Sequence, residues 1–214
     1  MTNTTSYTIE EAIKLMKEEK KRNFDPTVEI HINLDLDVKQ ANQQLRYTVV
    51  LPKGTGKKVK IAVLSIGKYP EADIELSEQD IQKIETGSLK PKVDFDVIIT
   101  EPGFMPKIAK AAKILGPLGM MPNPKTGTVT NNIALAIEEV KKGKVEVRTE
   151  KDAPLVHTIV GKLSFSEADL TENISSVISS LKANRPSKVK PDWIKGIAVC
   201  SSMGRSYQLK FSGE

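Results

Sequence analysis

The stretch Val28-Glu-Ile-His-Ile-Asn-Leu-Asp-Leu-Asp37 alternates apolar and polar side chains from end to end. Successive side chains of a β-strand point to opposite faces of a sheet, so this period of two predicts a strand with one buried face and one face open to water. Residues 45–51 repeat the pattern. Strands of the same half-buried style return near the other end of the chain, at residues 145–149, 155–163, 193–200 and 206–211.

The middle of the chain has a different pattern. Residues 60–65 and 95–99 contain short continuous apolar runs, which are typical of strands covered on both faces. Helical patterns lie between and after these runs, at residues 77–85, 105–115 and 131–141. Because strands and helices alternate here, the middle is predicted to be a small α/β domain with a parallel sheet.

Two more helices accompany the half-buried strands. Thr8 and Glu11 have the spacing of a capping box at the start of a helix. The charged residues 17–22 that follow are interpreted as the solvated end of this helix. A second helix is predicted to follow the cap formed by residues 166–169.

These patterns together predict a protein of mixed class, α/β and α+β, with two domains. A discontinuous α+β outer domain consists of residues 1–54 and 144–214, and an α/β domain of residues 55–143 is inserted into it. The two covalent crossings carry Gly54 and Gly143, and we predict that these glycines form a hinge between the domains.

The charge distribution favours a polyanionic partner. The chain has 214 residues, with 32 Lys and Arg against 27 Asp and Glu, for a formal net charge of +5. Residues 71–101 hold nine acids and three lysines, whereas residues 181–214 hold seven basic residues and two acids. A polyanion is therefore expected to meet the outer domain, and the acidic part of the insertion is expected to face elsewhere.

Cysteine and histidine are scarce. One cysteine excludes a disulfide framework and indicates a reducing compartment, and one cysteine with two histidines is too few for an ordinary structural zinc site, so no metal is expected. No apolar run approaches the roughly 18 residues that a membrane span needs, and residues 1–15 lack the apolar stretch of a signal peptide. These features predict a soluble intracellular protein without membrane contact.

No enzyme signature stands out. Gly54-Thr-Gly-Lys-Lys58 lacks the first glycine and the hydroxyl residue of a phosphate-binding loop and is interpreted as a turn. His31 and His157 lie far apart in sequence, and Cys200 is interpreted as a small core residue. We therefore predict that the chain is not an enzyme and needs no cofactor.

Two glycine-containing loops have features of RNA-binding segments. Residues 114–128 hold three prolines and three glycines and include a G-x-x-G sequence, and they form either a functional loop or a structural connector. Residues 201–206 combine hydroxyl groups with Met203, Gly204 and Arg205, a set suited to contacts with ribose, base and phosphate.

The string Gly116-Pro-Leu-Gly-Met-Met-Pro-Asn-Pro-Lys-Thr-Gly-Thr128 resembles the signature of the large-subunit ribosomal protein L-one family, in its bacterial and organellar type. The resemblance covers residues 23–210, and matching segments occur in the expected order at residues 24–31, 46–57, 143–146, 161–165 and 202–204. It implies the fold of that family, an outer α+β domain with an inserted Rossmann-like α/β domain.

The resemblance also implies a function. Members of the family bind a stalk junction in large-subunit rRNA, help to release deacylated tRNA from the exit site, and in many cases repress translation of their own mRNA by binding its leader. Carried over by position, the residues that bind RNA are Phe24, Thr27, Glu29, Lys162, Ser202, Met203, Gly204 and Arg205.

The resemblance further implies a monomer when free, which resides on the ribosome in the cytoplasm or in an organelle. Two alternatives stay open, namely a dedicated regulatory mRNA-binding protein with the same RNA-binding residues and a nucleotide-dependent enzyme built on the inserted domain. Four positions depart from the usual family pattern, with Asn23 in place of Lys, Leu118 in place of Arg, Ser202 in place of Thr and Arg205 in place of Pro.

Overall fold

The computed structural model describes residues 5–20, 22–186 and 189–210. Contacts between Cα atoms divide the chain into two compact units. The first unit consists of Met1–Gly56 and Lys142–Glu214, and the second consists of Lys57–Lys141. The assignment of the chain to an outer domain and an inserted Rossmann-like domain stays a proposal.

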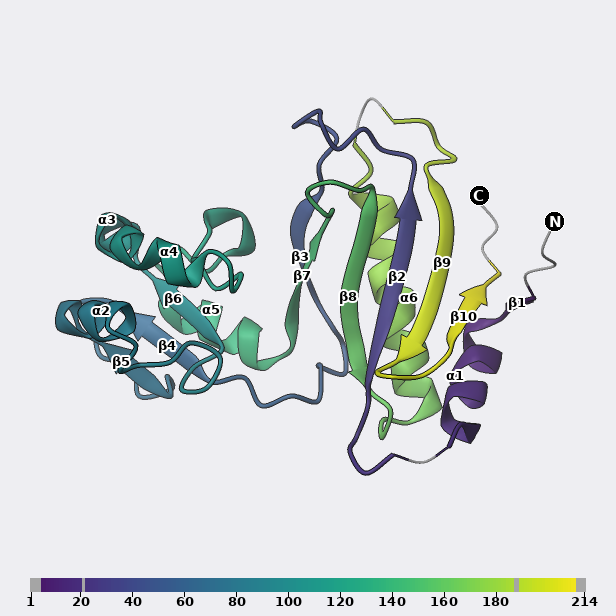
Figure 1. Ribbon diagram of the computed structural model, residues 1–214, viewed down its shortest axis with the longest axis horizontal. Coiled ribbons are helices and arrows are strands. Elements are labelled where there is room, and N and C mark those ends of the chain that lie inside the picture. The colour runs from purple at the N-terminus through teal and green to yellow at the C-terminus, as the bar shows by residue number, and fades with distance from the viewer. Residues whose placement is uncertain (1–4, 21, 187–188, 211–214) are drawn as a thin grey trace. The chain divides into compact units, whose positions relative to one another are not determined.

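A five-stranded sheet forms the centre of the first unit (Figure 1). Its order is β1-β10-β9-β2-β8, and β2 (Thr27–Leu34) lies antiparallel between β8 (Leu155–Lys162) and β9 (Ile194–Ser201). Strand β10 (Ser206–Leu209) pairs antiparallel with β9, and the short β1 (Ser6–Tyr7) adds a parallel edge. One sheet therefore combines strands from both ends of the chain.

The period-two pattern of β2 is confirmed. Alternate residues from Val28 to Leu34 are buried, and the side chains between them are partly or fully exposed. Two helices, α1 (Ile9–Glu18) and α6 (Glu167–Ala183), pack their apolar residues into the same core, and Figure 1 shows α6 behind the sheet. The opposite face of the sheet, which we call the open face, carries the polar positions of β2.

The starts of both helices agree with the caps predicted from the sequence. In α1, the Glu11 backbone N–H donates to Thr8 Oγ1 at 3.2 Å, and the Thr8 backbone N–H donates to Glu11 Oε2 at 2.8 Å. In α6, the Asp169 backbone N–H donates to Ser166 Oγ at 3.1 Å. These bonds satisfy backbone donors that the first helical turn leaves unpaired.

A two-stranded sheet of β3 (Arg46–Val50) and β7 (Lys144–Arg148) lies where the chain leaves and re-enters the first unit. Next to it, Gly143 (φ +98°) packs so closely that an added Cβ would lie 2.5 Å from the Gly54 Cα. The side chain of the buried Asn173 donates to the Gly54 carbonyl oxygen at 3.0 Å and accepts from the Lys53 backbone N–H at 3.1 Å. Both crossings are therefore held against the first unit, and their role as a hinge stays a prediction.

The second unit contains a three-stranded parallel sheet of order β5-β4-β6. The strands are β4 (Ile61–Leu64), β5 (Ile74–Leu76) and β6 (Val97–Thr100). Every residue of β4 is buried, which confirms that this strand is covered on both faces.

The helices of the second unit pack against opposite faces of its sheet. Ala62 and Leu64 of β4 belong to one core with apolar residues of α2 (Glu78–Glu85), whereas Ile61 and Val63 belong to another core with α5 (Ile133–Lys141). The predicted alternation of helices and parallel strands is thus confirmed.

Two features of the second unit differ from the sequence prediction. Residues 105–115 form not one helix but α3 (Met105–Ile108), a 3₁₀ turn and α4 (Ala112–Leu115), because the Ala112 N–H bonds back only three residues, to Ala109. Strand β5 was missed because three residues are too few to display a period. The last residue predicted for the strand at 206–211 lies outside the described residues.

None of the helices in the described part of the chain has the length and apolar character needed to cross a bilayer.

Candidate nucleic-acid interface

One end of β2 carries polar side chains toward solvent. Thr27 begins this strand and pairs in register with Lys162, the last residue of β8. Lys162 Nζ donates to Thr27 Oγ1 at 2.9 Å and to the carbonyl oxygen of Asp25 at 3.3 Å. Glu29 follows two residues after Thr27 and is partly exposed. The structure therefore places an ammonium group, a hydroxyl and a carboxylate near one another at the edge of the open face.

The turn between β9 and β10 is bonded to the start of β2. Ser202 donates to the carbonyl oxygen of Thr27 through its backbone N–H at 2.8 Å and through its hydroxyl at 3.3 Å. Met203 has a left-handed backbone (φ 63°) and is 86% exposed. Gly204 is packed so closely that an added Cβ would lie 2.1 Å from Ser201 Oγ. Two segments far apart in sequence are thus joined, and Met203 is left projecting into solvent.

Glu19 and Arg22 connect this turn to the end of α1. Arg22 Nη2 donates to the carbonyl oxygen of Met203 at 2.9 Å and forms an ion pair with Glu19 at 2.9 Å. Glu19 also accepts from the Arg205 backbone N–H at 3.0 Å and from the Tyr207 hydroxyl at 2.9 Å. Partial burial acts to raise the pKa of Glu19, but these bonds outweigh it and hold the pKa below its ordinary value.

Sequence reasoning missed the role of these two residues. The interpretation of residues 17–22 as a solvated helix end is wrong for Glu19 and Arg22, whose side chains are only 14% and 18% exposed. Opposite charges three positions apart are an available signal for the ion pair itself. Their bonds to the turn could not be predicted, because the partners lie 181 and 186 positions further along the chain.

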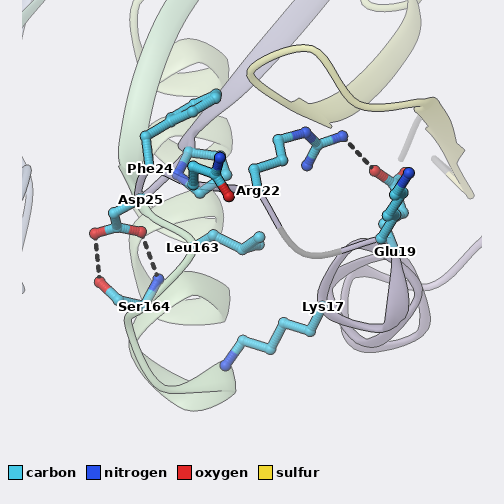
Figure 2. A pocket seen from close by; sticks show the side chains of 10 residues that line it. Lys17, Glu19, Arg22, Phe24, Asp25, Leu163 and Ser164 are labelled. Carbon is cyan, nitrogen blue, oxygen red and sulfur yellow. Dashed lines mark hydrogen bonds and ion pairs between the residues drawn. The ribbon is translucent and has the colours of Figure 1, made fainter.

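Phe24 lines a cavity of about 640 Å³ beside this network (Figure 2). Phe24 is 49% exposed. Asp25, which also lines the cavity, accepts bonds from the Ser164 hydroxyl at 2.7 Å and from the Ser164 backbone N–H at 3.2 Å. The cavity is lined by Lys17, Glu19, Lys20, Arg22, Asn23, Phe24, Asp25, Pro26, Leu163 and Ser164. An apolar ring bordered by cationic side chains can receive a base together with its phosphate.

Another cluster of titratable groups lies further along the open face. His31 on β2 and His157 on β8 are cross-strand partners, and their Nδ1 atoms are 2.6 Å apart. Cys200 on β9 lies opposite Glu29 in register, with its Sγ 3.0 Å from His31 Nε2. Burial, followed by the charge of His157, lowers the pKa of His31. Burial, followed by the charges of Glu29 and Glu19, raises the pKa of the Cys200 thiol.

This cluster corrects two interpretations of the sequence. Cys200 is not a core residue, because it belongs to the polar side of β9 and is partly exposed, whereas its neighbour Val199 is fully buried. His31 and His157 are far apart in sequence but adjacent in space, because strand pairing joins positions that differ by 126.

The remaining loops have structural explanations. Gly54 (φ +69°) and Gly56 (φ +73°) are left-handed, and the Gly54 N–H bonds back to Leu51, which confirms that this segment is a turn. In residues 114–128, Met120 is buried, and Leu118 packs partly against the core of the second unit. The packing of Leu118 favours a structural connector, and it gives an apolar role to the position where the family usually has Arg.

The sequence model of the ribosomal protein L1p/L10e family matches residues 16–205, a segment that includes the cavity, β2 and the turn after β9. The chain belongs to this family. The L1p/L10e match therefore confirms the resemblance found in the sequence.

Individual relatives of the L1p/L10e family agree over most of their length. The chain is 50% identical over 208 residues to large ribosomal subunit protein uL1c of Rhodomonas salina, covering 94% of this chain and 87% of the relative. It is 43% identical over 209 residues to large ribosomal subunit protein uL1 of Lactobacillus delbrueckii subsp. bulgaricus, covering 95% and 88%. It is 45% identical over 205 residues to uL1 of Prochlorococcus marinus (strain AS9601), covering 93% and 85%.

Proposed function

We propose that the chain is a structural constituent of the large ribosomal subunit and binds a folded junction of its rRNA. The surface that binds is named the RNA face and consists of Phe24, Thr27, Glu29, Lys162, Ser202, Met203, Gly204 and Arg205. The observation that carries the proposal is the pair of hydrogen bonds that Ser202 donates to the carbonyl oxygen of Thr27, because they join residues 175 positions apart into one surface.

The chemistry of the RNA face suits ribonucleotides better than duplex DNA. Thr27 and Ser202 offer hydroxyl groups, and Glu29 offers an acceptor for a ribose 2′-OH or a base amino group. Phe24 and Met203 supply exposed apolar contact, which bases that are not stacked in a helix can use. Arg22 donates to the carbonyl oxygen of Met203, and Lys162 donates to that of Asp25. These bonds fix the backbone of the RNA face and keep positive charge beside it.

The proposal is tested by a gel-shift titration with an rRNA fragment that contains the stalk junction. Met203→Asp is expected to weaken binding roughly 10- to 100-fold, because it places a carboxylate at the centre of the contact. Ile66→Asp is the matched control, since Ile66 lies in the second unit and is also 86% exposed. Equal binding by the two variants would rule out the RNA face. Affinity of the unaltered chain should also fall as salt rises, because phosphate contacts release counterions.

We further propose that the chain assists release of deacylated tRNA from the exit site and represses translation of its own mRNA by binding the leader. Both proposals rest on the family resemblance and use the same RNA face. Competition between the rRNA fragment and leader mRNA ranks the two targets, and the rRNA is expected to win. If the leader mRNA wins, the chain is a dedicated mRNA regulator, the first alternative.

The same proposal holds that the chain is a monomer when free, resides on ribosomes of the cytoplasm or an organelle, and has no enzymatic activity. An enzyme built on the second unit needs a cradle for phosphates, and the turn at Gly54 does not have that sequence. A rise in the melting temperature of the chain on addition of ATP or NAD would instead support the alternative of a nucleotide-dependent enzyme.

A further inference from the structure

Three potential metal ligands converge on the open face of the first unit. Glu29 and His31 are two residues apart on β2, and Cys200 lies opposite Glu29 in register on β9. His31 Nε2 is 3.0 Å from Cys200 Sγ and 3.9 Å from Glu29 Oε2, and all three donor atoms lie within 4.8 Å of one another. The three side chains are each partly buried. The period of two along β2 places Glu29 and His31 on one face, and the pairing of β2 with β9 brings the distant Cys200 to them.

The spacing of these donors suits a tetrahedral ion. Zinc lies about 2.3 Å from thiolate sulfur and about 2.0–2.2 Å from imidazole nitrogen and carboxylate oxygen. Two donors of a tetrahedral zinc ion are therefore roughly 3.3–3.7 Å apart, as simple geometry requires from those bond lengths. The two separations from His31 Nε2 bracket this range, and the third, between Cys200 Sγ and the Glu29 carboxylate, is within 4.8 Å, so adjustment of the side chains is what the ion would require.

A second set of contacts fixes the orientation of His31. Its Nδ1 lies 2.6 Å from Nδ1 of His157, so in a neutral pair the N–H of one ring donates a hydrogen bond to the nitrogen of the other. If His31 Nδ1–H is the donor, His157 carries its own proton on Nε2, which lies 3.6 Å from the Glu150 carboxylate. His31 Nε2 then has a free lone pair facing Cys200 and Glu29. His157 thus takes the place of the hydrogen-bond partner that usually orients a metal-binding imidazole, and the Glu150 carboxylate adds a negative charge beside His157.

We propose that Glu29, His31 and Cys200 bind a zinc ion, with a water molecule in the fourth position and with His157 and Glu150 as the outer support. The scarcity of cysteine and histidine argued against a zinc site in the sequence, but that count did not include a carboxylate ligand. One thiolate, one imidazole and one carboxylate form a donor set that zinc accepts, whereas magnesium and calcium prefer oxygen donors alone.

Cobalt(II) provides a test that uses the full chain without RNA. Bound at this site, Co²⁺ is expected to show intense visible bands of tetrahedral coordination and a near-ultraviolet band from thiolate-to-metal charge transfer. Added Zn²⁺ should abolish both. The chain contains one cysteine, so a thiolate band can only come from Cys200. Absence of that band would overturn the proposal even if no variant were available.

Variants test Cys200 and His31 as ligands, and His157 as their support, by calorimetric titration with zinc chloride. Cys200→Ser and His31→Gln are each expected to weaken zinc binding by more than 100-fold, and His157→Gln by roughly 10- to 100-fold through loss of outer support. Asp35→Asn removes an exposed carboxylate outside the cluster and should change nothing. Zinc affinity that is equal in Cys200→Ser and in the unaltered chain would contradict the site. Glu29 belongs to both the RNA face and this cluster, so the zinc site is proposed for the chain without RNA. Neither measurement contains nucleic acid, so failure of the zinc site can be told apart from failure of the RNA face.

Discussion

Gly204 occupies a position that tolerates no side chain. A Cβ there would lie 2.1 Å from Ser201 Oγ, 2.8 Å from Glu19 Oε2 and 3.0 Å from the Ser201 carbonyl oxygen. Ser201 is almost fully buried, so it cannot easily move aside. The sequence indicates only that a glycine is present in a turn, and its steric reason appears once α1 and β9 are in place.

Gly204→Ala is therefore expected to destabilise the first unit by about 1–3 kcal/mol, the usual cost of overpacking, and to displace Met203. Urea unfolding measures the loss of stability, and the rRNA gel shift measures the weaker binding that should accompany it. Gly196→Ala, in the strand β9 that leads into this turn, is the control, because its Cβ would meet only Gln208 Oε1 at an ordinary 3.7 Å. Equal stability of the two variants would contradict the steric argument.

Residue-level predictions from the sequence succeeded for local features and failed for distant ones. The capping partners of α1 are three positions apart, and they were found. The bonds of Glu19 to Arg205 and Tyr207 and the contact of Cys200 with His31 join positions more than 160 apart, and periodicity contains no information about them. The RNA-binding roles of individual residues stay predictions.

At the scale of elements, helix α2 depends on the charge of Asp80. Asp80 Oδ2 accepts from the Ser77 backbone N–H at 2.8 Å and from the Ser77 hydroxyl at 2.6 Å, and Oδ1 pairs with Lys83 at 2.7 Å. The bonds from Lys83 and then Ser77 lower the pKa of Asp80 from 3.8 to about 2. The carboxylate thus closes the first turn of the helix at neutral pH.

Asp80→Ala is expected to destabilise the second unit by about 1 kcal/mol at pH 7, as loss of a helix cap does. Because the folded pKa is the lower one, the contribution is complete above pH 3.8 and fades as the pH falls toward about 2. Urea unfolding of the unaltered chain and of Asp80→Ala, measured from pH 7 down to about 2, should show their free energies of unfolding converging as the pH falls. Glu85→Ala changes an exposed residue at the opposite end of α2 and is the control, with a stability at pH 7 expected within about 0.5 kcal/mol of the unaltered chain.

Whole elements were largely predictable, because burial imposes a period on the sequence. The alternation of β2 and the continuous apolar run of β4 both translated into the expected exposure. The break in residues 105–115 was not predictable, since a tightened turn keeps almost the same spacing of apolar residues as a helix. Strand β5 has only three residues and is fixed by its partner β4.

At the scale of the molecule, the chain leaves the first unit and returns to it at adjacent points. The Leu51 backbone N–H donates to the Gly143 carbonyl oxygen at 3.2 Å, and Gly54 touches Gly143. The acidic and basic segments found in the sequence belong to different units. The acidic residues 71–101 lie in the second unit, and the basic residues 181–214 lie in the first.

Removal of residues 57–141, with Gly56 joined directly to Lys142, is therefore expected to leave the first unit folded. Strands β3 and β7 would become a hairpin with a short loop, and the cost of loop closure depends only weakly on loop length. The shortened chain should unfold cooperatively and bind the rRNA fragment within about threefold of the full chain, since that is under 1 kcal/mol. Loss of cooperative unfolding would show that the first unit needs the second.

The position of β2 in its sheet has a consequence for biosynthesis. Its two neighbours, β8 and β9, begin only at Leu155 and Ile194, so β2 leaves the ribosome long before either partner exists. The 57–141 unit is then complete while the apolar side of β2 still lacks its sheet. The apolar face of β2 therefore stays unpaired and exposed through more than half of the synthesis of the chain. Residues 27–34 are thus a segment of the nascent chain that a chaperone would bind.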